Sequence, residues 1–398
     1  MGQAKREWEE YEARGWSAPD KHVCPNCVED EFLKTLIRNN ASTMKCNYCG
    51  KRTSRPSAAP VESIMPAVAS ALGYFYAELT HAGVPYDGGW VFEPTDTADA
   101  LMGVPFECHD DLFEDVANSF SNTAWVAAAD GHWASSHRNE EWSGEWQTFS
   151  EIVRHRSRHF FMSSIKESES PFQASPLQVL EFVGNMAARL GLLTSLPETT
   201  KLYRVREIVG GATWTICAEE LGAPPSRLAN AGRMNPAGIS YLYMSMTRGG
   251  AFAEVLRGPP CRAAIASFEV VEALAVLDLT RLPPLPSVFD GANHRVREVV
   301  LFLDDFVADI CQPVQKDGRE HIDYVPSQVV SEYFAQVFKT SGGGMLDGIV
   351  YPSAVSLGSV NLALFPRSGY VPFAHAVKFV DGDEVALNSW AEFSKIIS

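Results

Sequence analysis

Residues 233–254 carry three side chains whose types suit chemistry on a small anionic substrate. Arg233 supplies a guanidinium, Tyr243 a phenol and Glu254 a carboxylate, at spacings of 10 and 11 residues. A guanidinium binds phosphate oxygens through paired hydrogen bonds, and a carboxylate stabilises positive charge that develops on a nearby carbon. Spacing alone favours a plainer interpretation, in which the arginine is a solvated turn residue, the tyrosine packs in a core and the carboxylate lies at the surface.

A predicted turn, strand and short helix would position these three side chains. Asn235-Pro236-Ala237-Gly238 is typical of a turn, because proline fixes one φ and glycine accepts a positive one. The mixed aromatic and polar run 239–246 predicts a strand, and a helix over 247–256 would carry Glu254. A strand end and the following helix can face one cleft, so the three side chains are candidates for a common site.

Several separated motifs over residues 200–370 resemble the RES family, which is named for its Arg, Glu and Ser. Three of them are R-x-N-x-x-G from Arg233, the tyrosine ten residues later and A-x-x-E ending at Glu254. The others are Leu202-Tyr203-Arg204, Asp323-Tyr324-Val325-Pro326-Ser327-Gln328, and Asp347 to Ser353 followed by Asn361-Leu362-Ala363-Leu364-Phe365. Position 327 is Ser where the family usually has Thr. Because the motifs occur in the family's order, the resemblance is specific.

The resemblance implies an α+β fold similar to that of ADP-ribosyltransferases, and cleavage of the bond between nicotinamide and ribose in NAD⁺. It implies catalytic roles for Arg233, Tyr243, Glu254 and Ser353, and substrate-binding roles for Arg204, Tyr324, Gln328 and Asn361. Arg206 remains an alternative to Arg204 on the same predicted strand. Tyr241 is likewise an alternative to Tyr243. Ser327 and Gln328 also form an ordinary helix N-terminal signal.

The same resemblance implies a toxin or defence effector that depletes cellular NAD⁺. Attack by water would make the enzyme a glycohydrolase and attack by inorganic phosphate a phosphorylase, and the residues do not choose between them. Small RES toxins pair with a helix-turn-helix antitoxin, so we expect an antitoxin or another regulatory protein as a partner, and a homodimer is also open. The alternatives are ADP-ribosyl transfer to a macromolecule, and a HEPN-type ribonuclease or binding protein with an inactive RES domain.

Two C-x-x-C pairs predict a metal site without reference to any family. Cys24 and Cys27 are followed, after eighteen residues, by Cys46 and Cys49, and Gly50 comes next. Each pair can occupy two corners of a tetrahedral Zn²⁺ site, where the glycine relieves a tight turn. Four thiolates leave no position for water, so we expect a structural Zn²⁺. A redox dithiol would need only one pair.

These motifs divide the chain into a zinc-ribbon-like module at 1–56, a mainly α-helical domain at 57–195 and a RES catalytic domain at 196–398. The middle region resembles, in its arrangement, the HEPN-type region that precedes some RES domains. Within it, Arg154 and His159 have the spacing that marks HEPN ribonucleases. The plainer interpretation is a helix that packs its basic face on an acidic neighbour.

The order of predicted elements favours an α+β fold over a regular βαβ array. Strand-like runs occupy 201–206, 239–246, 262–271, 347–351, 360–365 and 374–380, and helix-like runs occupy 247–256, 295–311 and 325–338. Before them, helices are predicted at 5–14, at 61–81 with Pro66 in the first turn, at 107–126 and at 142–165. The clearest helix is 175–193, because Ser175 is a natural N-cap and Pro176 suits the first position.

Composition narrows the function classes. The chain has 398 residues, 46% of them hydrophobic, and a formal net charge of −16. Such a charge argues against a non-specific grip on nucleic acid, which needs clustered Lys and Arg. The first residues lack the apolar core of a secretory signal, and no run approaches the roughly 18 apolar residues that span a bilayer. We therefore expect a cytoplasmic protein that does not bind membranes.

Overall fold

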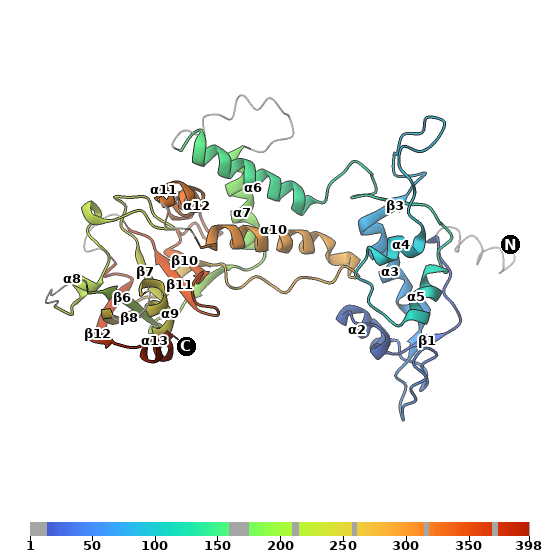
Figure 1. The fold of residues 1–398 in the computed structure, drawn as a ribbon, viewed down its shortest axis with the longest axis horizontal. Coiled ribbons are helices and arrows are strands. Elements are labelled where there is room, and N and C mark those ends of the chain that lie inside the picture. The colour runs from blue at the N-terminus through green and yellow to red at the C-terminus, as the bar shows by residue number, and fades with distance from the viewer. Residues whose placement is uncertain are drawn as a thin grey trace. The chain divides into compact units, whose positions relative to one another are not determined.

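The computed structural model describes residues 14–158, 175–208, 215–256, 261–313, 318–367 and 373–397. The chain forms two compact units, one of Met1–Glu141 with Pro284–Leu301 and one of Trp142–Pro283 with Phe302–Ser398. Helices and strands are mixed in irregular order, so the predicted α+β class is confirmed (Figure 1). The described residues include no helix that is both long and apolar enough to cross a membrane.

The first unit is built from short elements around a main core, with a smaller cluster of Leu79, Ala82 and Val84 in the same unit. Its strands pair antiparallel, β1 (His22–Val23) with β2 (Ala59–Pro60) and β3 (Tyr76–Glu78) with β4 (Trp125–Ala127). Its helices are α2 (Glu31–Asn39), α3 (Met65–Phe75), α4 (Thr97–Met102) and α5 (Asp110–Ala117), with 3-10 turns at Pro25–Cys27, Val61–Ser63 and Gly291–Asn293. Buried side chains of α2, α3 and α5 pack together with Val288 and Phe289.

Two predicted helices of this unit are shorter than expected. Pro66 lies in the first turn of α3, as predicted, where its missing N–H costs no hydrogen bond. The helix ends at Phe75 because residues 76–78 pair with residues 125–127. The predicted helix over 61–81 therefore stops early, and the one over 107–126 gives way to a strand. The predicted helix over 5–14 falls almost wholly outside the described residues.

A mixed sheet forms the centre of the second unit. Among the described residues it has eight strands, in the order β12-β8-β6-β7-β11-β10-β9-β5. The strands are β5 (Leu193–Leu196), β6 (Lys201–Glu207), β7 (Leu242–Ser245), β8 (Cys261–Val270), β9 (Leu274–Asp278), β10 (Gly348–Pro352), β11 (Val360–Leu364) and β12 (Val377–Leu387). Only the β9–β10 pair is parallel within this described sheet. All six predicted strand-like runs are therefore found, and β5 and β9 are additional.

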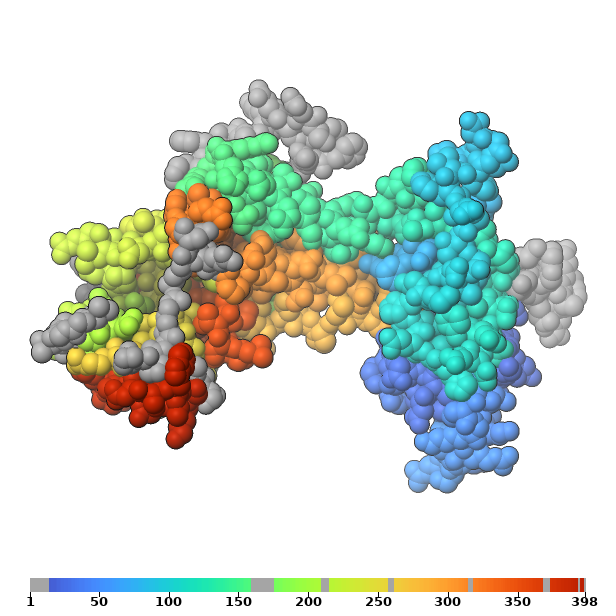
Figure 2. Space-filling model, viewed as in Figure 1, coloured from blue at the N-terminus to red at the C-terminus, as the bar shows by residue number. Residues whose placement is uncertain are grey.

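Helices pack against this sheet. One face carries α9 (Arg248–Val255) and α13 (Trp390–Ile397), which pack on Val205, Ala263 and Ile265. In Figure 2, the red C-terminal residues lie beside yellow residues of the same unit. The remaining helices are α6 (Arg138–His155), α7 (Pro176–Arg189), α8 (Ala218–Leu221), α10 (His294–Cys311), α11 (Glu320–Asp323) and α12 (Val325–Gln336), with a 3-10 turn at Ser226–Leu228.

Aromatic side chains pack three of these helices together. The ring of Trp146 on α6 lies 4.8 Å from that of Phe306 on α10, and Trp142 lies 4.6 Å from Phe182 on α7. The aromatic packing fixes α6 against the C-terminal half of α10.

The start of α7 has the predicted N-cap, because Ser175 and Gln178 form a reciprocal capping box.

The compact units and the sequence motifs divide the chain at different positions. Residues 142–195, assigned by sequence to the helical domain, cluster with the second unit, and residues 284–301 cluster with the first. The domain boundaries near residues 56 and 195 therefore stay predictions.

Candidate active site

A row of side chains across four neighbouring strands forms the floor of a cavity in the second unit. In the register of the sheet, Tyr203 lies opposite Ser245, and Ser245 lies opposite Asn361. Asn361 in turn lies opposite Tyr351. Side chains of residues paired across strands point to the same face of a sheet. All four line a cavity of about 340 Å³, together with Arg204, Arg233, Tyr243, Glu254 and Tyr324.

Glu254 is held beside this floor by two hydrogen bonds to one oxygen. Its Oε1 accepts from Ser353 Oγ at 2.7 Å and from Asn361 Nδ2 at 2.6 Å. The second bond also fixes the orientation of the amide, because only its NH₂ end can donate to a carboxylate. Since both donors use Oε1, Oε2 of this exposed side chain is left for a ligand.

Glu254 lies beside the floor because α9 begins only three residues after β7 ends. Thr247 caps α9 by accepting a hydrogen bond from the Gly250 amide at 3.1 Å. A Cβ at Gly250 would lie 2.5 Å from Ser245 Oγ, so glycine lets the helix start directly on the strand. The predicted turn, strand and helix are all present, and Gly238 has the expected positive φ, +87°.

The Tyr243 hydroxyl anchors the loop that precedes β7. It donates to Asn235 Oδ1 at 2.7 Å and accepts from the Met234 amide at 3.0 Å. Burial raises the pKa of Tyr243, so the phenol stays neutral in the physiological range. Asn235 Nδ2 in turn donates to the carbonyls of Asn230 and Ile239 at 2.9 and 2.8 Å. The ring of Tyr243 lines the cavity while its hydroxyl fixes the loop.

Gln328 lies behind the same loop. Its Nε2 donates to the carbonyls of Gly232 and Asn235 at 2.7 and 2.9 Å, and the side chain is buried. Ser327 Oγ donates to the carbonyl of Arg233 at 2.5 Å. Gln328 therefore supports the loop, and its predicted contact with substrate stays a prediction.

Arg204, and not Arg206, is the arginine of β6 that reaches the cavity. Its Nη1 donates to the Tyr243 carbonyl at 2.9 Å, and its buried Nε has no partner among the described residues. Burial and then repulsion from Arg206 lower the pKa of Arg204 to about 10, which still leaves a cation at neutral pH. Arg206 is exposed and donates to the Glu220 carbonyl instead.

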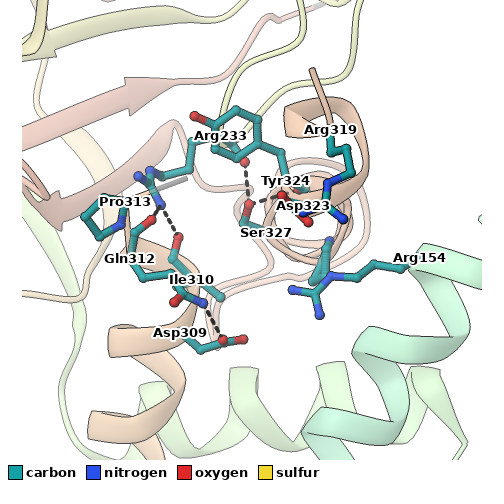
Figure 3. A pocket seen from close by; sticks show the side chains of 11 residues that line it. Arg154, Arg233, Asp309, Ile310, Gln312, Pro313, Arg319, Asp323, Tyr324 and Ser327 are labelled. Carbon is teal, nitrogen blue, oxygen red and sulfur yellow. Dashed lines mark hydrogen bonds between the residues drawn. The ribbon is translucent and has the colours of Figure 1, made fainter. Parts of the chain in front are cut away.

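Arg233 caps the end of α10. Its Nη1 donates to the carbonyls of Ile310 and Gln312, both at 2.8 Å, where helix carbonyls lack intrahelical partners (Figure 3). The guanidinium carbon lies 5.7 Å from the centroid of the Tyr324 ring. Because both Nη1 protons are used, Nε and Nη2 are the groups left to donate to a ligand.

Three floor residues were not selected from the sequence. Tyr203, Ser245 and Tyr351 all lie in recognised motifs or strands, but the face that each takes depends on pairing between distant strands. Ser245 had a usable signal, since it follows Tyr243 by two residues and so shares its face of β7. The alternative Tyr241 packs 5.4 Å from Phe365, in the interior.

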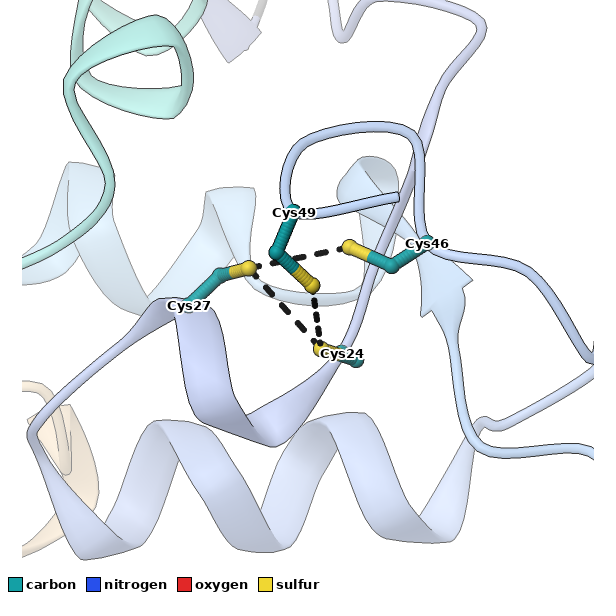
Figure 4. A group of neighbouring side chains, drawn as sticks. All are labelled: Cys24, Cys27, Cys46 and Cys49. Atoms are coloured by element: carbon teal, nitrogen blue, oxygen red, sulfur yellow. Dashed lines mark hydrogen bonds between the residues drawn. The ribbon is translucent and has the colours of Figure 1, made fainter. Parts of the chain in front are cut away.

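The four cysteines of the two C-x-x-C pairs converge in the first unit (Figure 4). The sulfur of Cys24 lies 3.5 Å from that of Cys49 and 3.8 Å from that of Cys27, and Cys27 lies 3.6 Å from Cys46. In a regular tetrahedron with Zn–S bonds of about 2.3 Å, sulfurs lie about 3.8 Å apart. Gly50, expected in a tight turn, has a positive φ, +69°. All four are free thiols, so the cluster can hold a metal ion.

Of the predicted Arg–His pair of the helical region, the structure describes only the arginine. Arg154 lies in the last turn of α6 and lines a cavity beside Arg233. His159 lies outside the described residues, so the ribonuclease interpretation of the pair stays a prediction.

Family comparison defines the class to which this sheet and cavity belong. Residues 201–386 match the family model of the RES domain, and residues 39–167 match that of HEPN/RES N-terminal domain 1. The chain is therefore a RES-domain protein that carries a HEPN/RES N-terminal domain. The resemblance expected from the sequence is confirmed, while the likeness to ADP-ribosyltransferases stays a prediction.

One solved structure to which the chain is similar is the MbcT–MbcA toxin–antitoxin complex of M. tuberculosis. The identity is 15%, the match covers 55% of this chain and 97% of that chain, and the TM-score is 0.29. No curated protein matches the chain.

Proposed function

We propose that this protein cleaves the bond between nicotinamide and ribose in NAD⁺. The observation that carries the proposal is the Glu254 carboxylate, held by Ser353 and Asn361 beside a cavity that two arginines line. The reaction needs a fixed carboxylate for positive charge on ribose and cations for a diphosphate. The RES domain match supports the same chemistry.

In the proposed reaction, the bond between ribose C1′ and the pyridinium nitrogen breaks, and its electron pair goes to the nitrogen. Neutral nicotinamide leaves while positive charge develops on the ribose. Glu254 Oε2 stabilises that charge and accepts a hydrogen bond from the ribose 2′-hydroxyl. Attack by water at C1′ gives ADP-ribose and a proton, and attack by inorganic phosphate gives ADP-ribose phosphate.

Two unpaired buried atoms support a polar ligand in this cavity. Arg204 Nε is a donor and Asn361 Oδ1 an acceptor, and neither has a partner among the described residues. Buried polar atoms are normally paired, so each is expected to meet a ligand atom. Tyr203 and Tyr351 also line the cavity, and an aromatic ring can interact favourably with the cationic pyridinium.

The test is to mix the purified protein with NAD⁺, with and without inorganic phosphate, and to separate the products by chromatography. Nicotinamide released by the wild type and not by Glu254→Ala supports the proposal. A phosphate-dependent ADP-ribose phosphate peak would identify phosphorolysis, whereas ADP-ribose attached to protein or nucleic acid would favour transfer. No nicotinamide in either buffer contradicts the proposal.

Depletion of NAD⁺ stops growth, so we place the protein among toxins or defence effectors that an antitoxin or regulatory protein controls. The RES domain match supports this role. Expression of the wild type in a bacterial host should lower NAD⁺ and stop growth, and Glu254→Gln should do neither. Growth arrest by both forms alike would point to another activity.

The metal of the first unit is proposed to be a structural Zn²⁺. Thiolate ligands select Zn²⁺ among the common divalent ions, and four protein ligands leave no position for catalysis. Cys24, Cys27, Cys46 and Cys49 would then tie two separate loops together. Metal analysis of the purified protein tests the identity of the ion.

A further inference from the structure

A second cavity adjoins the proposed active site. It measures about 370 Å³ and shares Arg233 and Tyr324 with the first cavity. Its other charged lining residues are Arg154 on α6, Asp309 on α10, and Arg319 and Asp323 at α11 (Figure 3). The two cavities therefore meet at one arginine and one tyrosine.

The charge of this second cavity favours an anion. Three arginines and two aspartates line it. Arg233 is shared with the first cavity, and Arg154 has a buried donor without a partner among the described residues. Asp309 is already engaged, because its Oδ2 accepts from Trp146 Nε1 and its Oδ1 from Gln312 Nε2, both at 2.8 Å. In a chain with a formal net charge of −16, a cavity lined by several arginines favours an anionic ligand over a cationic one.

Arg154 is brought to the cavity by the packing of α6. Trp146, two turns earlier on α6, packs on Phe306 and donates to Asp309. The Nε of Arg154 is buried and has no hydrogen-bond partner among the described residues. An unpaired buried donor is costly, so a ligand acceptor is expected at this position.

Arg233 can contact a ligand in both cavities. Its Nη1 is committed to the end of α10, which leaves Nε and Nη2 for phosphate oxygens. Each cavity alone is near the lower limit of the roughly 300–1,000 Å³ typical of small-molecule sites. A dinucleotide therefore needs both, with its diphosphate close to Arg233.

We propose that the second cavity binds the adenosine diphosphate half of the dinucleotide, and that Arg154 is a phosphate-binding residue. This inference rests on the proposed function and assigns the two ends of its substrate. Arg154 lies within the residues that match HEPN/RES N-terminal domain 1 and outside those that match the RES domain. The region before the RES domain thus completes the substrate site.

The first test measures ADP binding by isothermal titration calorimetry, which needs no turnover. Arg154→Ala should weaken ADP binding about 10- to 100-fold, the range for loss of a charge-assisted hydrogen bond. The matched control is Arg156→Ala, because Arg156 is exposed and two residues away. Thermal melts of both variants show whether they fold. Equal ADP affinity of wild type and a folded Arg154→Ala would overturn the proposal.

The second test compares kcat/KM for NAD⁺ with that for nicotinamide mononucleotide, which lacks the adenosine half. Arg154→Ala should lower kcat/KM about tenfold more for NAD⁺ than for the mononucleotide. Equal losses for both substrates would overturn the assignment. A raised requirement for inorganic phosphate, with ADP affinity unchanged, would also overturn it and would assign Arg154 to the attacking phosphate. Release of no nicotinamide from either substrate would refute the proposed function alone, because ADP binding that depends on Arg154 would still establish the second cavity.

Discussion

Asn361 donates its side-chain amide to Glu254 Oε1 at 2.6 Å, although 107 residues separate the two in the chain. The amide also keeps a buried oxygen that has no partner among the described residues. One side chain therefore orients the carboxylate and, in the proposed reaction, meets the ligand as well. The hydrogen bond joins the helix after β7 to the strand that lies beside β7 in the sheet.

Glu254→Gln should abolish most NAD⁺ cleavage while NAD⁺ still binds. The amide keeps the size of the carboxylate and removes the charge that stabilises the developing cation, so we expect kcat to fall about 10²- to 10³-fold. Nicotinamide release measures the loss, and calorimetry measures binding. Glu272→Gln is the control, because Glu272 is exposed and lies outside the cavity. Unchanged turnover in Glu254→Gln would remove this carboxylate from the mechanism.

Asn361→Asp should move the acidic limb of the pH–rate profile to higher pH. A second carboxyl group next to Glu254 shares a proton with it, because two like charges at this distance do not both ionise readily. If activity needs an ionised carboxylate, the acidic limb then shifts upward by about one pH unit or more. The profile of kcat/KM checks this, with Asn388→Asp at an exposed position as control. A limb that stays in place would show that it does not report Glu254.

Tyr243→Phe should destabilise the second unit by about 1–3 kcal/mol, the cost of leaving buried groups unpaired. The lost hydroxyl bonds both Asn235 and the Met234 amide, and these two residues are buried. Tyr241→Phe is a matched comparison on the same strand segment, since the Tyr241 hydroxyl has only a long contact, 3.4 Å, to Ser331. Urea unfolding should show a smaller loss for Tyr241→Phe. The reverse order would contradict the role given to the Tyr243 hydroxyl.

Cys46→Ser should remove the bound metal and lower the melting temperature of the first unit, and a strong chelator should have the same effect. Cys108→Ser serves as the control, because Cys108 lies outside the four-sulfur cluster. Burial raises the pKa of Cys24 to about 11, so without metal this thiol is protonated at neutral pH. Metal binding must then release protons, and affinity should fall as the pH is lowered. Metal retention by Cys46→Ser would refute the site.

Much of the site could be predicted because its parts are local signals. Arg233, Tyr243 and Glu254 lie on one continuous turn, strand and helix. The spacing of the four cysteines is by itself enough to predict a tetrahedral metal site. Ser353 and Asn361, selected from the motifs as a catalytic and a substrate-binding residue, both donate to the same carboxylate, a contact that the motifs did not predict. Their roles in catalysis remain predictions.

The missed parts depend on contacts between distant residues. β5 is a short, half-polar run whose only partner in the described sheet is β9, and β9 lies beside β10 in a parallel pair. The short apolar run of β9 does not differ by periodicity from a buried helix segment. No local sequence pattern predicts the hydrogen bonds from Gln328 to the loop before β7. The same holds for the hydrogen bonds from Arg233 to the end of α10.

The row of floor residues has a consequence for when the proposed active site can form during synthesis. β11, which carries Asn361, lies between β7 and β10 in the sheet. A nascent chain that has emerged from the ribosome only as far as residue 359 contains Arg204, Arg233 and Glu254. It still lacks β11, the strand that joins the two sides of the floor. If the protein cleaves NAD⁺ as proposed, most of the chain must be synthesised before this activity can begin.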